Sequence, residues 1–195
     1  MKALRFAVLG AAALFVAACL PVTTKNPVGS TAGFRPDAAL AGVWLAHGEN
    51  KDDKPGYIAF LGHGDNGMTA LLISPDGKDG EWESYTLETA MLGGNRYMNV
   101  RSALKNGEPD TDMGSADRIP MLYRLAKDGT ITLYILDDDK TAAAIKAGKI
   151  AGKIDPGSSG DVHITAAPKA LDAFFATKGG AALLDKPFVA LRRVK

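Results

Sequence analysis

The sequence is poor in the residues that build metal and redox sites. Cys19 is the only cysteine among 195 residues, so the chain can form neither an internal disulfide nor a dithiol redox pair. The three histidines, His47, His63 and His163, lack the i, i+2 or i, i+4 spacing of a local metal site. We therefore expect no metal and no cofactor.

The net charge is small and aromatic residues are scarce. The formal net charge is +1 and the only dense basic stretch is Leu191 to Lys195, which we interpret as solvated charge on a terminal strand. Proteins that bind nucleic acid carry a clustered basic surface, so we expect no nucleic acid partner. An aromatic content of 7%, together with 22 glycines and many short apolar runs, favours strands and turns over a helical bundle.

Motifs for nucleophilic catalysis and phosphate binding are missing or incomplete. The sequence contains no G-x-S-x-G elbow. Gly62, Gly64 and Gly67 match G-x-G-x-x-G, but the apolar run after them is too short for the helix that a dinucleotide site needs. Asp110 and Asp112 open an acidic loop that lacks the other ligands of a calcium loop.

Glu81, Glu83 and Glu88 are the remaining candidates for acid–base chemistry. They lie in and beside an alternating segment, and the alternation predicts that their side chains point outward. We therefore predict that the protein is not an enzyme. A hydrolase whose site the sequence does not reveal stays open as an alternative.

The first 18 residues have the pattern of a cleaved export signal. Lys2 and Arg5 form a positive head, residues 6–16 are apolar, and Ala17 and Ala18 are the small residues that a cleavage site needs. The apolar run is shorter than the roughly 20 residues of a membrane-spanning helix. Removal of this segment leaves 21 basic and 22 acidic residues, a net charge of −1.

Residues 15–19, Phe-Val-Ala-Ala-Cys, resemble the lipobox of bacterial lipoproteins. The resemblance implies cleavage between Ala18 and Cys19 and acylation of Cys19, which would explain an unpaired cysteine in an exported chain. Two or three acyl chains give a lasting membrane anchor. Leu20 stands where an inner-membrane retention signal would have Asp, so the resemblance implies the outer membrane of the cell envelope, facing the periplasm.

We expect three segments in the chain. Residues 1–18 form the signal peptide, residues 19–37 form the acylated cysteine and a flexible Pro- and Gly-containing tether, and residues 38–195 form a single domain. The domain length suits one hydrophobic core.

The fold that we predict is mainly β, with an antiparallel meander of about eight or nine strands closed into a barrel or half-barrel. Two short helices follow in the C-terminal third, at residues 140–147 and from Pro168 to the Gly179-Gly180 pair. The expected strands cover residues 39–46, 57–61, 68–73, 81–87, 97–102, 121–126, 130–136, 162–165 and 188–194.

Gly42-Val43-Trp44 on the first strand resembles the opening of lipocalins and related calycin-like barrels, in which the Trp packs across the closed end. Short motifs along most of the domain are similar to those of uncharacterised small bacterial lipoproteins, a group without known catalytic residues. They are Gly42-x-Trp44, Leu122-Tyr123-Arg124-Leu125, Asp128-Gly129-Thr130, Ile145-x-x-Gly148-x-Ile150, Val162-x-Ile164-Thr165-Ala166, Leu171-x-x-Phe174 and Leu191-Arg192-Arg193.

We therefore expect a lipid-anchored envelope protein that binds a small apolar ligand or a partner protein without catalysis. Trp44, Tyr57, Trp82 and Tyr97 are the aromatic residues that we expect in a pocket or core. The alternative is a structural or assembly lipoprotein that acts through protein contacts of its loops and helices.

Overall fold

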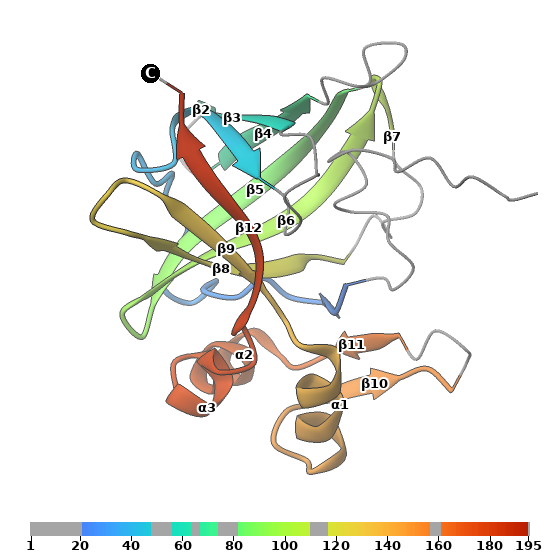
Figure 1. Ribbon diagram of the computed structural model, residues 1–195. Coiled ribbons are helices and arrows are strands. Elements are labelled where there is room, and N and C mark those ends of the chain that lie inside the picture. The colour runs from blue at the N-terminus through green and yellow to red at the C-terminus, as the bar shows by residue number, and fades with distance from the viewer. Residues whose placement is uncertain are drawn as a thin grey trace, which may run out of the picture.

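The computed structural model describes residues 21–47, 56–63, 67–73, 82–109, 117–156 and 161–194. It shows a closed antiparallel β-barrel with a small α/β layer packed against one side of it (Figure 1). The barrel strands are β2 (Gly42–His47), β3 (Gly56–His63), β4 (Gly67–Ile73), β5 (Trp82–Leu92), β6 (Asn95–Lys105), β8 (Ile119–Leu125), β9 (Ile131–Ile135) and β12 (Lys186–Arg193).

Each barrel strand pairs with the next along the chain, and β12 closes the ring by pairing with both β9 and β2. The predicted mainly β fold with a barrel of about eight strands is therefore confirmed. A short strand, β7 (Glu108–Pro109), adds one further pairing at the end of β6. Closure leaves none of these eight strands at an open edge of the sheet.

Local sequence explains the hairpins. Gly93 and Gly94 join β5 to β6, and both have positive φ angles, +58° and +78°. Two residues with positive φ form the turn whose twist matches that of paired antiparallel strands. The G-x-G-x-x-G stretch is likewise the connection of a hairpin, because Gly62 pairs with Met68 and Gly67 opens β4 where a nucleotide site would need a helix.

Two separate hydrophobic cores hold the domain together. The first fills the barrel with inward-facing side chains from all eight strands, among them Trp44, Phe60, Met68 and Met98. The second lies outside the barrel, where Tyr97 and Leu122 pack against the α/β layer. In Figure 1 this layer lies below the barrel, away from β2, β3 and β4.

The α/β layer consists of three helices and a three-stranded sheet of order β1-β11-β10. Its elements are β1 (Thr23–Thr24), α1 (Asp138–Lys146), β10 (Gly152–Ile154), β11 (Val162–Ile164), α2 (Pro168–Phe175) and α3 (Lys178–Ala181).

The two predicted helices correspond to α1 and α2. Asp137 caps α1 by accepting a hydrogen bond from the Lys140 amide, and Leu171 and Phe175 of α2 are fully buried. The Gly179-Gly180 pair was expected to end the second helix, but it lies inside α3. Thr177 begins that extra turn by accepting a hydrogen bond from the Gly180 amide.

The prediction of a flexible tether is wrong for residues 21–37. Val22 and Val28 are buried in the second core, and β1 pairs with β11 in parallel. The Asn99 side chain, on the outer face of β6, donates to the Val28 carbonyl and accepts from the Val28 amide. The segment has no periodic apolar pattern because only isolated side chains anchor it, and the partners are far away in the sequence.

Across the described residues, none of the helices has the length and apolar character that crossing a bilayer requires.

Candidate functional site

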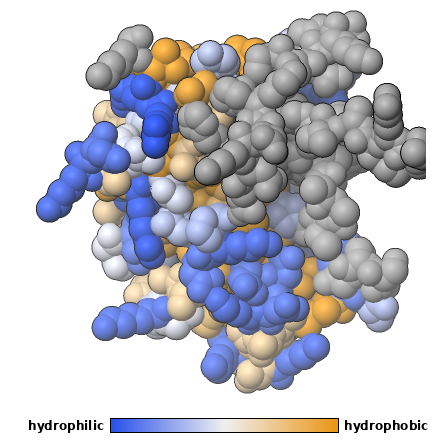
Figure 2. Space-filling model, in the orientation of Figure 1, coloured by the Kyte–Doolittle hydropathy of each residue, from blue (hydrophilic) through white to orange (hydrophobic). Residues whose placement is uncertain are grey.

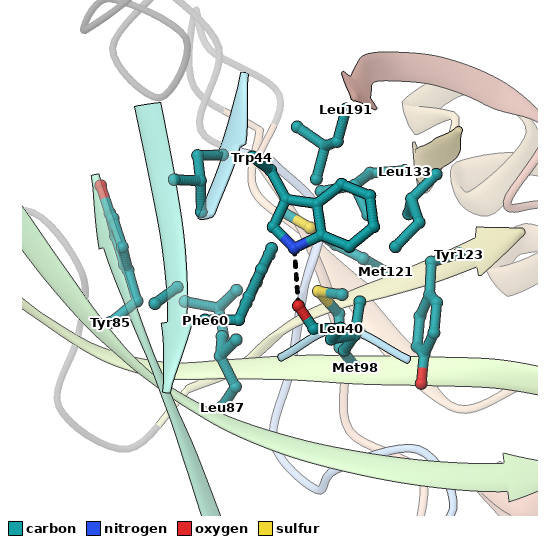
Figure 3. Close-up of a cluster of buried hydrophobic side chains, with 14 of the residues drawn as sticks. Leu40, Trp44, Phe60, Tyr85, Leu87, Met98, Met121, Tyr123, Leu133 and Leu191 are labelled. Carbon is teal, nitrogen blue, oxygen red and sulfur yellow. Dashed lines mark hydrogen bonds between the residues drawn. The ribbon is translucent and has the colours of Figure 1, made fainter. Parts of the chain in front are cut away.

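Trp44 lies in the interior of the barrel, as part of the first core (Figure 3). Its indole Nε1 donates a hydrogen bond to the Leu40 carbonyl at 2.6 Å, so its polar atom is satisfied while the ring is buried. The guanidinium of Arg193 stacks on the ring, 4.5 Å from its centroid, and donates to the Ala39 and Ala41 carbonyls. Arg193 is exposed, as expected of solvated charge on a terminal strand, and it also covers one face of the Trp44 ring.

Tyr97 faces the opposite way, into the second core. Its hydroxyl donates to the Phe175 carbonyl at 3.0 Å, and its ring makes an edge contact with that of Phe175. Burial raises the pKa of Tyr97 to about 12, against a smaller lowering by a hydrogen bond with Asn95. Tyr97 thus joins the barrel to α2 and lines no cavity of the barrel interior.

Tyr57 and Trp82 belong to neither of the two hydrophobic cores. They lie on the outside of the barrel, 40% and 37% exposed. The Trp82 backbone exchanges hydrogen bonds with Asn106 at the β6–β7 turn, which fixes the register that turns the indole outward. The strand alternation that buries Tyr85 and Leu87 leaves Trp82 on the solvent side.

Glu83, the next residue after Trp82, faces into the barrel, whereas the alternation predicted that its side chain points outward. It is 8% exposed and accepts a hydrogen bond from the Tyr85 hydroxyl. Glu88 does point outward, and lies within 4 Å of the guanidinium groups of Arg101 and Arg118. The two carboxylates are on opposite faces of β5, so the structure does not bring them together.

The exposed aromatic residues belong to a larger surface, which we call the apolar wall. It is formed by outward-facing hydrophobic side chains of β2 to β6. Its members are Val43, Leu45, Tyr57, Ala59, Leu61, Leu71, Ile73, Trp82 and Leu104. Six of them are between 37% and 53% exposed, and exposed apolar side chains that are contiguous mark a contact surface.

Strand register organises the apolar wall into two rows. Leu45, Tyr57, Ile73 and Trp82 are successive cross-strand partners on β2, β3, β4 and β5. Directly cross-strand residues on one face have Cβ atoms about 5 Å apart, so each row is a continuous ridge. The second row consists of Val43, Ala59, Leu71 and Leu104, with the polar Ser84 between Leu71 and Leu104. Leu61, whose cross-strand partner is Thr69, belongs to neither row.

No member of the apolar wall carries a charge, and the outward-facing neighbours Thr69, Ser84 and Thr86 are also uncharged, whereas the exposed Arg192 of β12, the cross-strand partner of Leu45, borders the wall with a positive charge. Depletion of charge with enrichment of Tyr and Trp is typical of the centre of a protein interface. Figure 2 shows hydrophobic surface at the upper edge of the molecule, above the strands labelled β2 and β3 in Figure 1.

The apolar wall lies opposite the side of the barrel that the α/β layer covers. In the closed ring, β3 and β8 are separated by four steps in either direction. The outward side chains Leu122 of β8 and Tyr134 of β9 are in or against the second core. One wall of the barrel is therefore covered by the chain itself, and the other presents the exposed ridges.

Histidine and glycine candidates give no site in the described part of the chain. His163 Nδ1 is 2.7 Å from the Thr23 hydroxyl and 3.7 Å from a carboxylate oxygen of Asp117. Among the described residues, no three His, Cys, Asp or Glu side chains form a group that could hold a metal ion. The side chains of His47 and His63, and the residues Ala18, Cys19, Asp110 and Asp112, lie outside the described part of the chain.

Sequence reasoning missed the apolar wall, although a signal for it exists. Residues 68–73, Met-Thr-Ala-Leu-Leu-Ile, are apolar on both faces of the strand, whereas a half-solvated strand alternates. Met68, Ala70 and Leu72 are buried inside the barrel, and Leu71 and Ile73 are on the wall. An antiparallel strand that is apolar on both faces indicates a second contact surface.

No protein family model matches the chain, and neither the curated proteins nor the solved structures contain a significant match to it.

Proposed function

We propose that this chain is a lipid-anchored protein of the bacterial cell envelope that binds a partner protein through the apolar wall and catalyses no reaction. Residues 15–19 supply the lipobox with Cys19 as the acylated residue. The observation that carries the partner is the pair of exposed, uncharged ridges on one side of the barrel.

The position of the anchor favours a protein over the bilayer as the occupant of the apolar wall. Pro21, the first described residue, precedes β1, and Thr24 of β1 bridges to Arg118 at the start of β8. Cys19 is two residues before Pro21, so their Cα atoms are at most about 8 Å apart. The described chain therefore begins on the side of the barrel that the α/β layer covers, and we propose that the anchor joins it there.

Packing inside the barrel favours the partner protein over a small apolar ligand. Trp44 and Met98 are 1% exposed and lie among the buried side chains of the barrel interior (Figure 3), where lipocalin-like proteins hold their ligand. Met68, also 1% exposed, belongs to the same core. A ligand there would have to displace close-packed side chains. Truncation of one such side chain costs roughly 2–5 kcal/mol of folding stability, so the displacement is unfavourable. The outer ridges need no such rearrangement.

Ring closure also determines how the partner binds. With all eight strands paired, a partner cannot add a strand to an open edge over the described barrel. It must contact side chains, and a face centred on Tyr57, Ile73 and Trp82 fits an apolar helix or sheet surface of another envelope protein.

The anchor is tested by replacing Cys19. We expect the full-length protein, produced in a bacterium, to incorporate labelled palmitate and to sediment with the outer membrane. Cys19→Ala should lose the label and leave the membrane fraction. A Cys19→Ala protein that still sediments with membranes would contradict the lipid anchor.

The partner surface is tested by a photo-crosslinking amino acid placed singly at Leu61 or Ile73, with the exposed position Lys169 of α2 as the control. We expect one discrete adduct from the wall positions in intact cells, none from Lys169, and loss of the adduct when Tyr57→Lys is added. Adducts to lipid, a product of twice the chain mass, or equal labelling at Lys169 would each contradict a heterologous partner on the apolar wall.

A further inference from the structure

A depression with a volume of about 500 Å³ lies at the barrel end formed by the β5–β6 hairpin and the N-terminal segment. Arg35 and Asp37 line it from the N-terminal segment, Arg96 from the start of β6, and Tyr123 from β8. The volume is within the range of small-molecule sites, about 300–1,000 Å³.

The inner side of the depression is a hydrogen-bonded group of three side chains. A single oxygen of Asp37, Oδ2, accepts from the Arg96 guanidinium at 2.9 Å and from the Tyr123 hydroxyl at 2.7 Å. The other oxygen accepts from the Ala39 amide. Burial, and then the Asp37 carboxylate, raise the pKa of Tyr123 above its ordinary value, so its hydroxyl remains a donor.

This arrangement holds Arg96 in place without using all of its donors. The bond to Asp37 goes through Nη1, and the Arg96 side chain is 36% exposed. A guanidinium has five N–H donors in a planar fork, so Arg96 has donors left for a planar anion. Because Asp37 already orients the Arg96 guanidinium, the Arg96 side chain loses less conformational entropy when a ligand binds.

Arg35 adds a second guanidinium at the rim. Its backbone is fixed on β5, since its amide donates to the Thr89 carbonyl and the Thr89 hydroxyl donates to its carbonyl. Its side chain is exposed. The lining residues Arg35, Arg96 and Asp37 together carry one excess positive charge, which one monoanion neutralises.

The rest of the lining is apolar or uncharged. Ala32, Pro36, Ala90 and Met91 contribute hydrocarbon surface beside the two guanidinium groups. Met91 is 54% exposed, and its flexible side chain can fold over a bound hydrocarbon group. A hydrated inorganic ion would leave this surface unused.

We propose that the depression binds a small monocarboxylate with a short hydrocarbon group. The carboxylate pairs with Arg35 and with the free donors of Arg96, and the hydrocarbon lies against Ala90 and Met91. Asp37 and Tyr123 are positioning residues for Arg96. The site is independent of the apolar wall, and its test requires neither a partner protein nor the lipid anchor.

The test is a titration of the full-length protein in a non-ionic detergent with sodium butyrate, followed by saturation-transfer NMR of the butyrate protons. We expect saturable millimolar binding. Arg35→Gln and Arg96→Gln should each weaken it at least tenfold, and Arg96→Lys should weaken it because an ammonium lacks the planar fork. Arg192→Gln, which removes an exposed charge from β12, should leave it unchanged.

Two competitors separate the chemical classes. Butanol has the same hydrocarbon without the charge, and inorganic phosphate has charge without hydrocarbon, so we expect neither to displace butyrate at equal concentration. No binding of butyrate, equal binding of butanol, displacement by phosphate, or an equal loss in Arg192→Gln would each overturn the proposal. Arg35→Gln keeps the test decisive if Arg96→Gln unfolds, because the Arg35 side chain is exposed.

Discussion

The carboxylate of Asp172 on α2 accepts a hydrogen bond from the Gly29 amide at 2.6 Å, across 143 positions of sequence. Its other oxygen accepts from the amide and the hydroxyl of Thr31, at 2.8 and 2.6 Å. Asp172 is 3% exposed, so these three donors are what stabilise a buried carboxylate. The contact holds the N-terminal segment against the α/β layer.

Removal of this carboxylate should loosen the N-terminal segment. Asp172→Ala leaves the buried Gly29 amide without its acceptor, and we expect a loss of roughly 3 kcal/mol in the free energy of unfolding, measured in urea. Cleavage by a protease within residues 21–37 should become faster. Thr31→Val, which removes only the hydroxyl bond, should cost about 1 kcal/mol. Equal losses in the two variants would show that the amide bonds contribute nothing.

Gly29 and Gly129 allow the backbone strain at a glycine to be separated from a steric clash. Both have positive φ angles, +89° and +84°, so alanine is strained at either position. A Cβ at Gly29 would overlap the Cβ of Ala90, whereas a Cβ at Gly129 has open space around it. We expect Gly129→Ala to cost about 1 kcal/mol and Gly29→Ala about 2 kcal/mol more, measured by thermal unfolding. Similar melting temperatures for the two variants would mean that the segment moves away from Ala90 freely.

Tyr97 should make stability fall at alkaline pH. Burial raises its pKa to about 12 in the folded protein, and the unfolded phenol ionises near its ordinary value of 10. Below pH 10 the buried neutral phenol contributes its full share to the free energy of unfolding. This contribution, about 3 kcal/mol, is lost as the pH rises from 10 to 12.

Tyr97→Phe is the comparison for this pH dependence. Other titrating groups are shared by the two proteins and cancel in the difference. We expect the stability advantage of the wild type over Tyr97→Phe, measured in urea, to shrink from pH 9 to pH 12. A difference that stays constant over this range would show that the phenol does not stay neutral in the folded state.

The two tryptophans of the chain should differ in solvent access. Trp44 is 1% exposed in the barrel, and Trp82 is 37% exposed on the apolar wall. We expect Trp82→Phe to shift the fluorescence maximum to shorter wavelength and to protect the remaining emission from acrylamide. Trp44→Phe should have the opposite effect on both measurements. Equal quenching of the two variants would show that Trp82 is shielded from solvent, and would contradict the apolar wall as an open surface.

Local sequence determined most of the barrel. The predicted runs at residues 57–61, 68–73 and 130–136 lie in or overlap β3, β4 and β9, and the Gly93-Gly94 pair forms the β5–β6 turn. Alternation and turn chemistry act over a few residues, so they can be seen without knowledge of the fold. The same holds for α1, which Asp137 caps, and for α2, which begins at Pro168 and has the local apolar spacing of Leu171 and Phe175.

The tertiary structure alone decided which face of each strand would be solvated. Trp82 and Glu83 are neighbours, and composition favours burying the Trp, yet the register with Ile73 and Leu72 places the Trp outside and the Glu inside. A shift of one residue would invert the whole strand, and register is set by all eight strands together. For this reason the apolar wall, and with it the proposed partner surface, could not be read from one strand at a time.

The contacts of the N-terminal segment and the depression beside Arg96 could not be predicted from local sequence either. Nothing in residues 21–37 predicts Asp172, Asn99 or Tyr123 as partners, because these contacts span 71 to 143 positions of the chain. The sequence by itself determined a barrel and two helices. It also predicts acylation of Cys19. Closure of the ring decided what covers one wall, what stays exposed on the other, and which charged side chains meet at its end, because those depend on long-range pairing that no local pattern encodes.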